Sequence, residues 1–135
     1  RNYYARHDYE AIETAKANAL MAALEASLAG LPGHSFGPLT VEAADQFAYV
    51  DPVDGSESRN QGVRVMFACG SRIVFRLSGT GTEGATLRVY LERYEAPDGR
   101  LGEETPAMLA DLIAAADLIA GIAAHTGRTA PDVVT

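Results

Sequence analysis

The sequence predicts an α+β domain in which a four-stranded antiparallel sheet packs with two helices. Three observations support this prediction. Four strand-like stretches follow one another through the middle of the chain. One helical pattern precedes them and a second helical pattern follows them. Short connections that contain glycine join neighbouring stretches, which is typical of antiparallel strand pairs.

The first helix is expected over residues 8–30. Asp8 is a residue type that caps helix N-termini by accepting backbone N–H bonds. Apolar residues recur at helical spacing in this range, among them Ile12, Leu20 and Leu24. The pattern therefore predicts an amphipathic helix whose apolar face packs against the sheet.

The four strands are expected over residues 39–49, 61–67, 72–77 and 85–94. The second and fourth alternate most clearly, so that one face of each is apolar: Val63, Val65 and Phe67 in the second, and Leu87, Val89 and Leu91 in the fourth. Residues 68–71 predict a short turn, and hence a hairpin, between the second and third strands. Residues 51–56 are dense in turn-forming residues.

The second helix is expected to begin at Thr105 and to stop at Gly127. Thr105 suits the N-cap, and Pro106 suits the first helical position because its fixed φ is already helical. An apolar stripe follows at helical spacing, formed by Met108, Leu109, Leu112, Ile113, Ala116, Ile119, Ile122 and Ala123. Gly127 suits a left-handed C-terminal position, so the order of elements is α-β-β-β-β-α.

The length and composition of the chain exclude several classes of protein. The chain has 135 residues, which is enough for a single domain with its own core. Its hydrophobic fraction of 47% excludes a largely disordered chain. No apolar run reaches the ~18 residues that a membrane-spanning helix needs, so we expect no membrane partner.

Charge and cysteine content narrow the possible partners. The net charge is −7, from 11 Lys and Arg against 18 Asp and Glu. A broad surface for nucleic acid or anionic membrane carries the opposite sign, so we expect no nucleic-acid partner and only local anion sites. Cys69 is the only cysteine, which excludes an internal disulfide and fits a reducing, cytoplasmic compartment.

The richest stretch for chemistry is the glycine-rich segment between the third and fourth strands. Gly79, Gly81 and Gly84 match the pattern G-x-G-x-x-G. A dinucleotide-binding site requires a helix after the third glycine, whereas the residues after Gly84 alternate as a strand. A protein-kinase loop lies between antiparallel strands, but the other kinase motifs and the necessary length are absent.

The residues of this loop suit a phosphate. Ser78, Thr80 and Thr82 supply hydroxyls, and the glycines let backbone N–H groups turn toward an anion. Arg76 precedes the loop and Arg88 follows it, and a guanidinium binds phosphate oxygens in a bidentate fork. The alternative is a flexible glycine-rich hairpin flanked by ordinary surface arginines. The predicted phosphate-binding residues are Arg76, Ser78, Gly79, Thr80, Gly81 and Arg88.

Other reactive residues suit structural roles better. His7, His34 and His125 are too far apart in sequence to show a metal-ligand spacing, and we expect them to be surface or cap residues. Asp51 and Asp54 fit turns, and Cys69 lies in a turn without a histidine nearby in sequence. The sequence therefore predicts neither a catalytic residue nor a metal ligand in this chain.

The glycine-rich loop and its flanks resemble the phosphoglucomutase branch of the α-D-phosphohexomutase superfamily. The resemblance rests on residues 70–81, which read Gly-Ser-Arg-Ile-Val-Phe-Arg-Leu-Ser-Gly-Thr-Gly, and on residues 51–56, 60–62 and 127–131. Residues 1–4, Arg6 and residues 8–10 resemble the entry into the fourth domain of that family. The chain departs from the family pattern only in loop lengths and in its alanine-rich helices.

The resemblance implies a specific role. Family members are four-domain isomerases of glucose and carbohydrate metabolism that interconvert glucose 1-phosphate and glucose 6-phosphate through glucose 1,6-bisphosphate. The first domain carries a phosphoserine, the second holds Mg²⁺, and the third recognises the sugar. The fourth binds the phosphate that is not being transferred, and its fold resembles the TATA-box-binding protein. Residues 1–135 are thus expected to be this C-terminal domain.

Two functions remain open from the sequence. In the first, the chain is a segment of a longer phosphoglucomutase, as its start at Arg1 without an initiator methionine suggests. In the second, it is a stand-alone, non-catalytic phosphate-binding or scaffolding paralogue. The retention of Arg76, Ser78, Thr80 and Arg88 favours the first function, because a scaffold does not need an anion site.

Overall fold

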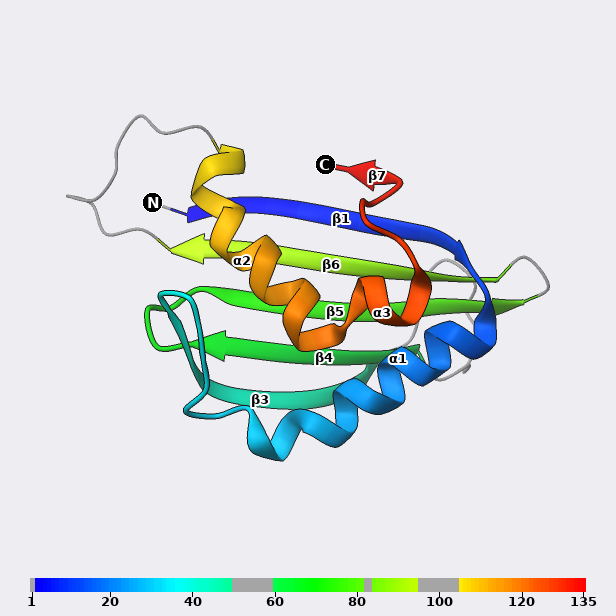
Figure 1. Ribbon diagram of the computed structural model, residues 1–135, viewed down its shortest axis with the longest axis horizontal. Helices are drawn as coiled ribbons and strands as arrows, with labels where there is room; N and C mark the ends of the chain where they lie inside the picture. Colours follow the sequence, from blue (N-terminus) through cyan, green and yellow to red (C-terminus); the bar gives the residue numbers. More distant parts are fainter. Residues whose placement is uncertain (1, 50–59, 82–83, 95–104) are drawn as a thin grey trace.

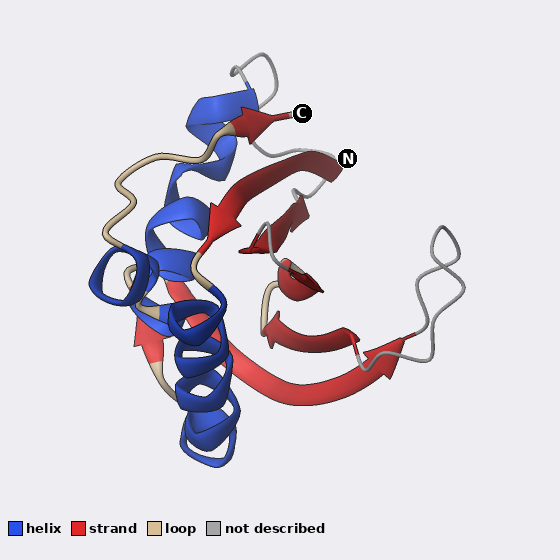
Figure 2. Cartoon of the chain, turned by 90° about the vertical axis from the view of Figure 1, so that its right-hand side faces the viewer, coloured by secondary structure: helices blue, strands red, loops and turns tan. Residues whose placement is uncertain are grey.

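One curled antiparallel sheet, with helices on one of its faces, forms the frame of the protein (Figures 1 and 2). The structure is a computed structural model that describes residues 2–49, 60–81, 84–94 and 105–135. Its elements in chain order are β1 (Asn2–Ile12), α1 (Thr14–Ser27), a 3₁₀ turn (Leu28–Gly30), β2 (Ser35–Phe36), β3 (Leu39–Tyr49), β4 (Asn60–Phe67), β5 (Arg72–Gly81), β6 (Gly84–Tyr94), α2 (Thr105–Ala120), α3 (Ile122–Thr126) and β7 (Val133–Val134).

The sheet has more strands than the sequence predicts. Its order is β2-β3-β4-β5-β6-β1-β7, and every neighbouring pair is antiparallel. The four predicted strands are β3 to β6, which are neighbours in chain order as expected. The α+β class is therefore confirmed, whereas the four-stranded sheet is wrong because β1 and the two-residue strands β2 and β7 extend it to seven.

The first eleven described residues form a strand rather than the start of a helix. β1 pairs with β6 from Asn2 opposite Tyr94 to Asp8 opposite Arg88 and beyond. Asp8 is therefore a strand residue and not the predicted N-cap, and the helix begins only at Thr14. The pairing partner of β1 lies some 80 residues away in sequence, so the local helical pattern that we read from Asp8 onward missed it.

Apolar side chains on alternate strand positions form the core against the helices. The predicted apolar faces of β4 and β6 are confirmed. Buried side chains include Val63, Val65, Phe67, Ile73, Phe75, Leu87, Val89 and Leu91 from the strands, and Leu20, Leu24, Leu109 and Leu112 from the helices. Because strand side chains alternate between faces, the residues between them point to the face that the helices leave open.

The predicted second helix is interrupted. α2 ends at Ala120, Gly121 adopts a left-handed φ of 62°, and α3 continues to Thr126. The predicted stop at Gly127 is confirmed, with a left-handed φ of 73°. Thr105 is the first helical residue, one position from its predicted role as the N-cap.

β1 ends in an irregular turn that approaches the glycine-rich hairpin. The β1–β6 register shifts between Tyr9 and Ile12, and Ala11 has a left-handed φ of 52°. Gly84 opens β6 with a φ of 89°, and a Cβ atom there would lie 2.7 Å from the Ile12 carbonyl oxygen. A glycine is therefore required where the hairpin meets β1.

Hydrogen bonds of Arg128 and Asp132, near the end of the chain, stabilise this turn. The Arg128 Nη2 group donates to the Glu10 carbonyl oxygen at 2.8 Å. The Asp132 carboxylate accepts from the Glu10 backbone N–H at 2.7 Å and from Arg128 Nη1 at 2.7 Å. The bond from the Glu10 N–H lowers the pKa of Asp132, with a further contribution from Arg128. These contacts hold the end of β1 beside Gly84.

Replacing Gly84 by alanine is expected to cost about 1–3 kcal/mol of unfolding free energy. The cost has two sources, the unfavourable φ and the contact with the Ile12 carbonyl oxygen. Gly37→Ala is the matched control, since Gly37 has a φ of 60° with nothing within 4 Å of an added Cβ. It is expected to lose only about 1 kcal/mol. Urea unfolding of residues 1–135 measures the stability of both variants. Equal losses would show that the backbone moves away from the added Cβ atom at position 84 without a cost in stability.

Candidate functional site: an arginine-bearing sheet face

The β5–β6 hairpin places the two predicted arginines side by side. The strands are antiparallel, and Arg76 lies directly opposite Arg88. Their neighbours Phe75, Leu77 and Val89 are buried on the helix side. Both arginines therefore lie on the open face, as expected from the sequence. β6 begins at Gly84 as a strand, so the helix that a dinucleotide site requires does not follow the third glycine.

The remaining loop residues lie at the same end of the hairpin. Ser78 is opposite Thr86, and Gly81 is opposite Gly84 across a register shift. Residues 79–81 complete β5. The side chain of Thr80, together with residues 82–83, lies outside the described part of the structure. The structure therefore brings Arg76, Ser78 and Arg88 to one end of two adjacent strands.

β1 contributes two residues to this face that the sequence reasoning missed. Asp8 is opposite Arg88 in the β1–β6 register, and its side chain is only 4% exposed. Its carboxylate forms ion pairs with Arg6, with Nε and Oδ1 3.0 Å apart, and with Arg88, with Nε and Oδ2 3.7 Å apart. The signal that could have revealed them is the spacing of Arg6, Asp8 and Glu10, which is the period of one strand face.

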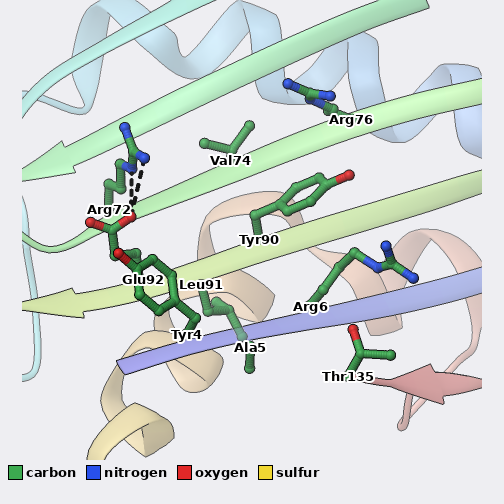
Figure 3. Close-up of a pocket in the computed structure, with 10 residues that line it drawn as sticks. All are labelled: Tyr4, Ala5, Arg6, Arg72, Val74, Arg76, Tyr90, Leu91, Glu92 and Thr135. Carbon is green, nitrogen blue, oxygen red and sulfur yellow. Dashed lines mark hydrogen bonds and ion pairs between the residues drawn. The ribbon is translucent and has the colours of Figure 1, made fainter. Parts of the chain in front are cut away.

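A pocket of about 470 Å³ lies on the open face, where Arg6, Arg72 and Arg76 line it and Arg88 does not (Figure 3). Arg6 and Arg76 lie on either side of Tyr90, and Thr135 lies next to Arg6. The Arg76 guanidinium stacks on Tyr90 with its carbon 5.3 Å from the ring centre, and it lies 5.8 Å from the ring centre of Phe47. Stacking restrains a long side chain and leaves the edge of its guanidinium for hydrogen bonds.

The open face carries a local excess of positive charge. Among the described residues, four arginines lie on β1, β5 and β6 here, namely Arg6, Arg72, Arg76 and Arg88, and the ion pairs found there join Arg6 and Arg88 to Asp8 and Arg72 to Glu92. Glu92 holds Arg72 at 3.1 Å. The whole chain has a net charge of −7, so the net charge of this group of side chains is opposite in sign to that of the whole chain. Such a patch attracts small anions, and arginine forks suit phosphate.

The other reactive side chains do not converge on the site. Cys69 is exposed in the β4–β5 turn, where its thiol lies 3.3 Å from the Ser71 hydroxyl. Asp51 and Asp54 lie outside the described residues. Within the described ranges, no three His, Cys, Asp or Glu side chains come together to hold a metal ion. In the same ranges no helix has the length and apolar character to cross a bilayer.

His7 is a buried histidine on the helix side of β1, next to Asp8, and not the surface or cap residue that the sequence predicts. Burial lowers its pKa below the ordinary value of 6.5, and the charge of Asp8 opposes this shift. The folded state therefore binds this proton less readily than the unfolded chain does. The contribution of His7 to stability is fully present above pH 6.5 and is lost as the pH falls from 6.5 toward the lower folded pKa.

The pH dependence of stability is expected to change when His7 becomes glutamine, which does not titrate. Between about pH 7.5 and about pH 5.5, the unmodified chain should lose more stability than the His7→Gln variant. Urea unfolding at both pH values measures the two losses. Equal losses would show that His7 binds its proton equally well in the folded and unfolded states.

Comparison with known proteins identifies the family. The sequence profile described as "Phosphoglucomutase-1, C-terminal domain" matches residues 1–132. The chain is 62% identical to a phosphoglucomutase of Rhizobium radiobacter over 135 residues, and 48% identical to human phosphoglucomutase-1 over 141 residues. In both comparisons the whole chain is covered, but it spans only 25% of the relative's length.

A solved structure shows the same fold. A crystal structure of parafusin, a phosphoglucomutase from Paramecium in its open form, matches with a TM-score of 0.78 and 45% identity. The match covers 100% of this chain and 23% of parafusin. The motif resemblance in the glycine-rich loop is therefore confirmed over the whole chain. With profile, relatives and fold in agreement, the chain belongs to the phosphoglucomutase C-terminal domain family.

Proposed function

We propose that the chain is the phosphate-binding, C-terminal domain of a four-domain phosphoglucomutase. Its hairpin would bind the phosphate that is not being transferred while glucose 1-phosphate and glucose 6-phosphate interconvert. The observation that carries this proposal is the register of β5 and β6, which sets Arg76 directly opposite Arg88 on the open face, with Ser78 two residues further along β5. Two guanidiniums and a hydroxyl supply the donors that a phosphate dianion requires.

The role of such a clamp follows from how phosphoryl transfer is catalysed. The reaction depends mainly on positioning and on stabilising charge. Binding the remote phosphate holds the sugar so that its other end meets the reacting group. Because the reaction passes through glucose 1,6-bisphosphate, which carries a phosphate at each end, one clamp serves both half-reactions.

The remaining parts of the chemistry are assigned to the rest of the parent chain. The reacting phosphoserine, the Mg²⁺ ion and the sugar-recognition loop would lie in the other three domains, and glucose 1,6-bisphosphate would be the activating cofactor. Within the described residues of this chain, no group of His, Cys, Asp or Glu side chains fits a Mg²⁺ site. A clamp at the end of the chain would also help to close the cleft over the substrate and exclude water.

The proposal places the protein in the cytoplasm, without a nucleic-acid or membrane partner. Two plant relatives, 44% identical to this chain, carry the word "cytoplasmic" in their names. The single cysteine, exposed and free, fits a reducing compartment. The negative net charge disfavours a broad surface for nucleic acid.

The isolated chain is expected to have no mutase activity. It would be assayed as residues 1–135 with glucose 1-phosphate, Mg²⁺ and glucose 1,6-bisphosphate, beside the full-length protein. The full-length protein should turn over and the isolated chain should match the blank, because the reacting groups are assigned to other domains. Turnover by the isolated chain would contradict this division, and a full-length protein that binds the sugar phosphate without turnover would favour the scaffolding alternative.

A further inference from the structure

Asp8 is a buried carboxylate that lies between two arginines of the open face. Its side chain is 4% exposed, whereas those of Arg6 and Arg88 are 39% and 40% exposed. The two Nε atoms lie near different carboxylate oxygens, Arg6 at 3.0 Å and Arg88 at 3.7 Å, in ion pairs that include no hydrogen bond from either Nε. Since a buried charge is costly without partners, Asp8 and the two guanidiniums form one unit.

Asp8 constrains the direction in which Arg88 points. Among the described residues, Asp8 is the only acidic partner of Arg88. A guanidinium is planar, so an ion pair at its Nε edge favours orientations in which the two terminal nitrogens point away from Asp8. Asp8 is itself held in β1, which pairs with β6 on one side and with β7 on the other. The buried carboxylate therefore provides a negative charge at a fixed position, to which the longer Arg88 side chain is attracted.

We propose that Asp8 is a positioning residue, which holds Arg88 in the orientation that binds the phosphate of the sugar. This inference rests on the proposed function of the loop. It assigns Asp8 no contact with the substrate, since its carboxylate would repel a phosphate at close range. With Arg6 and Arg88 both cationic, the unit of three side chains keeps a net positive charge and remains attractive to an anion.

The two possible roles of Asp8 predict opposite changes. If Asp8 only offsets positive charge, its neutralisation strengthens the attraction for phosphate, and KM for glucose 1-phosphate falls. If Asp8 positions Arg88, its neutralisation releases the guanidinium, and KM rises because a flexible side chain must be ordered on binding. The direction of the change in KM therefore separates the two roles.

The test uses Asp8→Asn in the full-length protein, because asparagine keeps the shape of the side chain and removes its charge. KM for glucose 1-phosphate is expected to rise roughly three- to tenfold, with kcat within about twofold of the unmodified protein. Asp45→Asn is the matched control. It breaks another Asp–Arg pair on the same sheet, in which Arg64 Nε lies 2.9 Å from Asp45 Oδ1, and it should leave KM unchanged.

A double-mutant cycle with Arg88→Ala identifies the partner through which Asp8 acts. Once Arg88 is absent, Asp8→Asn should cause no further rise in KM. A fall in KM for Asp8→Asn, or a full additional rise in the double variant, would overturn the positioning role. If Arg88→Ala alone leaves KM unchanged, the proposed function of the loop fails instead, so the two failures are distinguishable.

A spectroscopic measurement covers the case in which Asp8→Asn does not fold. The ¹⁵Nε signals of arginine would be recorded in the unmodified full-length protein without ligand, and Arg88 would be assigned by its loss in Arg88→Lys. The Arg88 Nε–H should exchange with water more slowly than the Nε–H of free arginine at the same pH and temperature. Equal exchange of the two would show that Asp8 does not hold Arg88 and would overturn the inference.

Discussion

Arg88→Ala in the full-length protein is expected to lower kcat/KM for glucose 1-phosphate by about tenfold to roughly twenty-thousandfold. The range corresponds to losing up to two charge-assisted hydrogen bonds of roughly 1.5–3 kcal/mol each. Most of the loss should appear as a higher KM, because the charge of the remote phosphate changes little between ground and transition states. Steady-state kinetics measure the effect, and a thermal melt checks that the variant is folded.

Two further substitutions compare how much different hydrogen-bond donors contribute to kcat/KM. Ser78→Ala should cost only about 0.5–1.5 kcal/mol, because a bond from a neutral hydroxyl is weaker than one from a guanidinium. Arg88→Lys should recover only part of the loss, since an ammonium group cannot form the bidentate fork. A folded Arg88→Ala variant with unchanged kcat/KM would show that Arg88 is an ordinary surface residue.

Phe75→Ala is expected to destabilise the chain by about 3–5 kcal/mol. Phe75 lies on β5 with 0% of its surface exposed, opposite Val63 on β4 and Val89 on β6. Truncation leaves a cavity in the layer between the sheet and the helices, which the surrounding backbone fills only in part. Urea unfolding of residues 1–135 measures the loss.

The neighbouring residue on the opposite face supplies the control for Phe75. Val74 precedes Phe75 in β5 and lines the open-face pocket instead of the core. Val74→Ala should therefore cost no more than about 1 kcal/mol. Losses of equal size at both positions would contradict the assignment of the two faces, and with it the placement of Arg76 and Arg88 on the open one.

The central strands could be predicted from the sequence because each carries its own alternating pattern. In β4 and β6 one face is buried against the helices and the other is open, so polar and apolar residues alternate. β1 could not be predicted in this way. Tyr9 and Ile12 are buried on either side of a register shift, which breaks the period of two, so the apolar spacing predicts a helix instead.

The candidate site could be predicted only where it is local in sequence. Arg76, Ser78 and Arg88 flank one glycine-rich turn, so a hairpin alone brings them together. Arg6 and Asp8 reach the same face through the β1–β6 pairing, whose partners are separated by 80 residues at Asp8 and Arg88. That pairing forms only in the folded sheet, and no turn signal near β1 indicates it.

The proposed phosphate clamp is tested most directly by calorimetric titration of glucose 1-phosphate into the dephosphorylated full-length protein. Arg88→Ala is compared with Arg64→Ala, which removes an arginine of the same sheet whose Nε and Nη2 donate to Asp45 at 2.9 Å each. Arg88→Ala is expected to weaken binding about tenfold or more, while Arg64→Ala leaves the affinity unchanged. Unchanged affinity in Arg88→Ala, or an equal loss in both variants, would contradict a phosphate site at this hairpin.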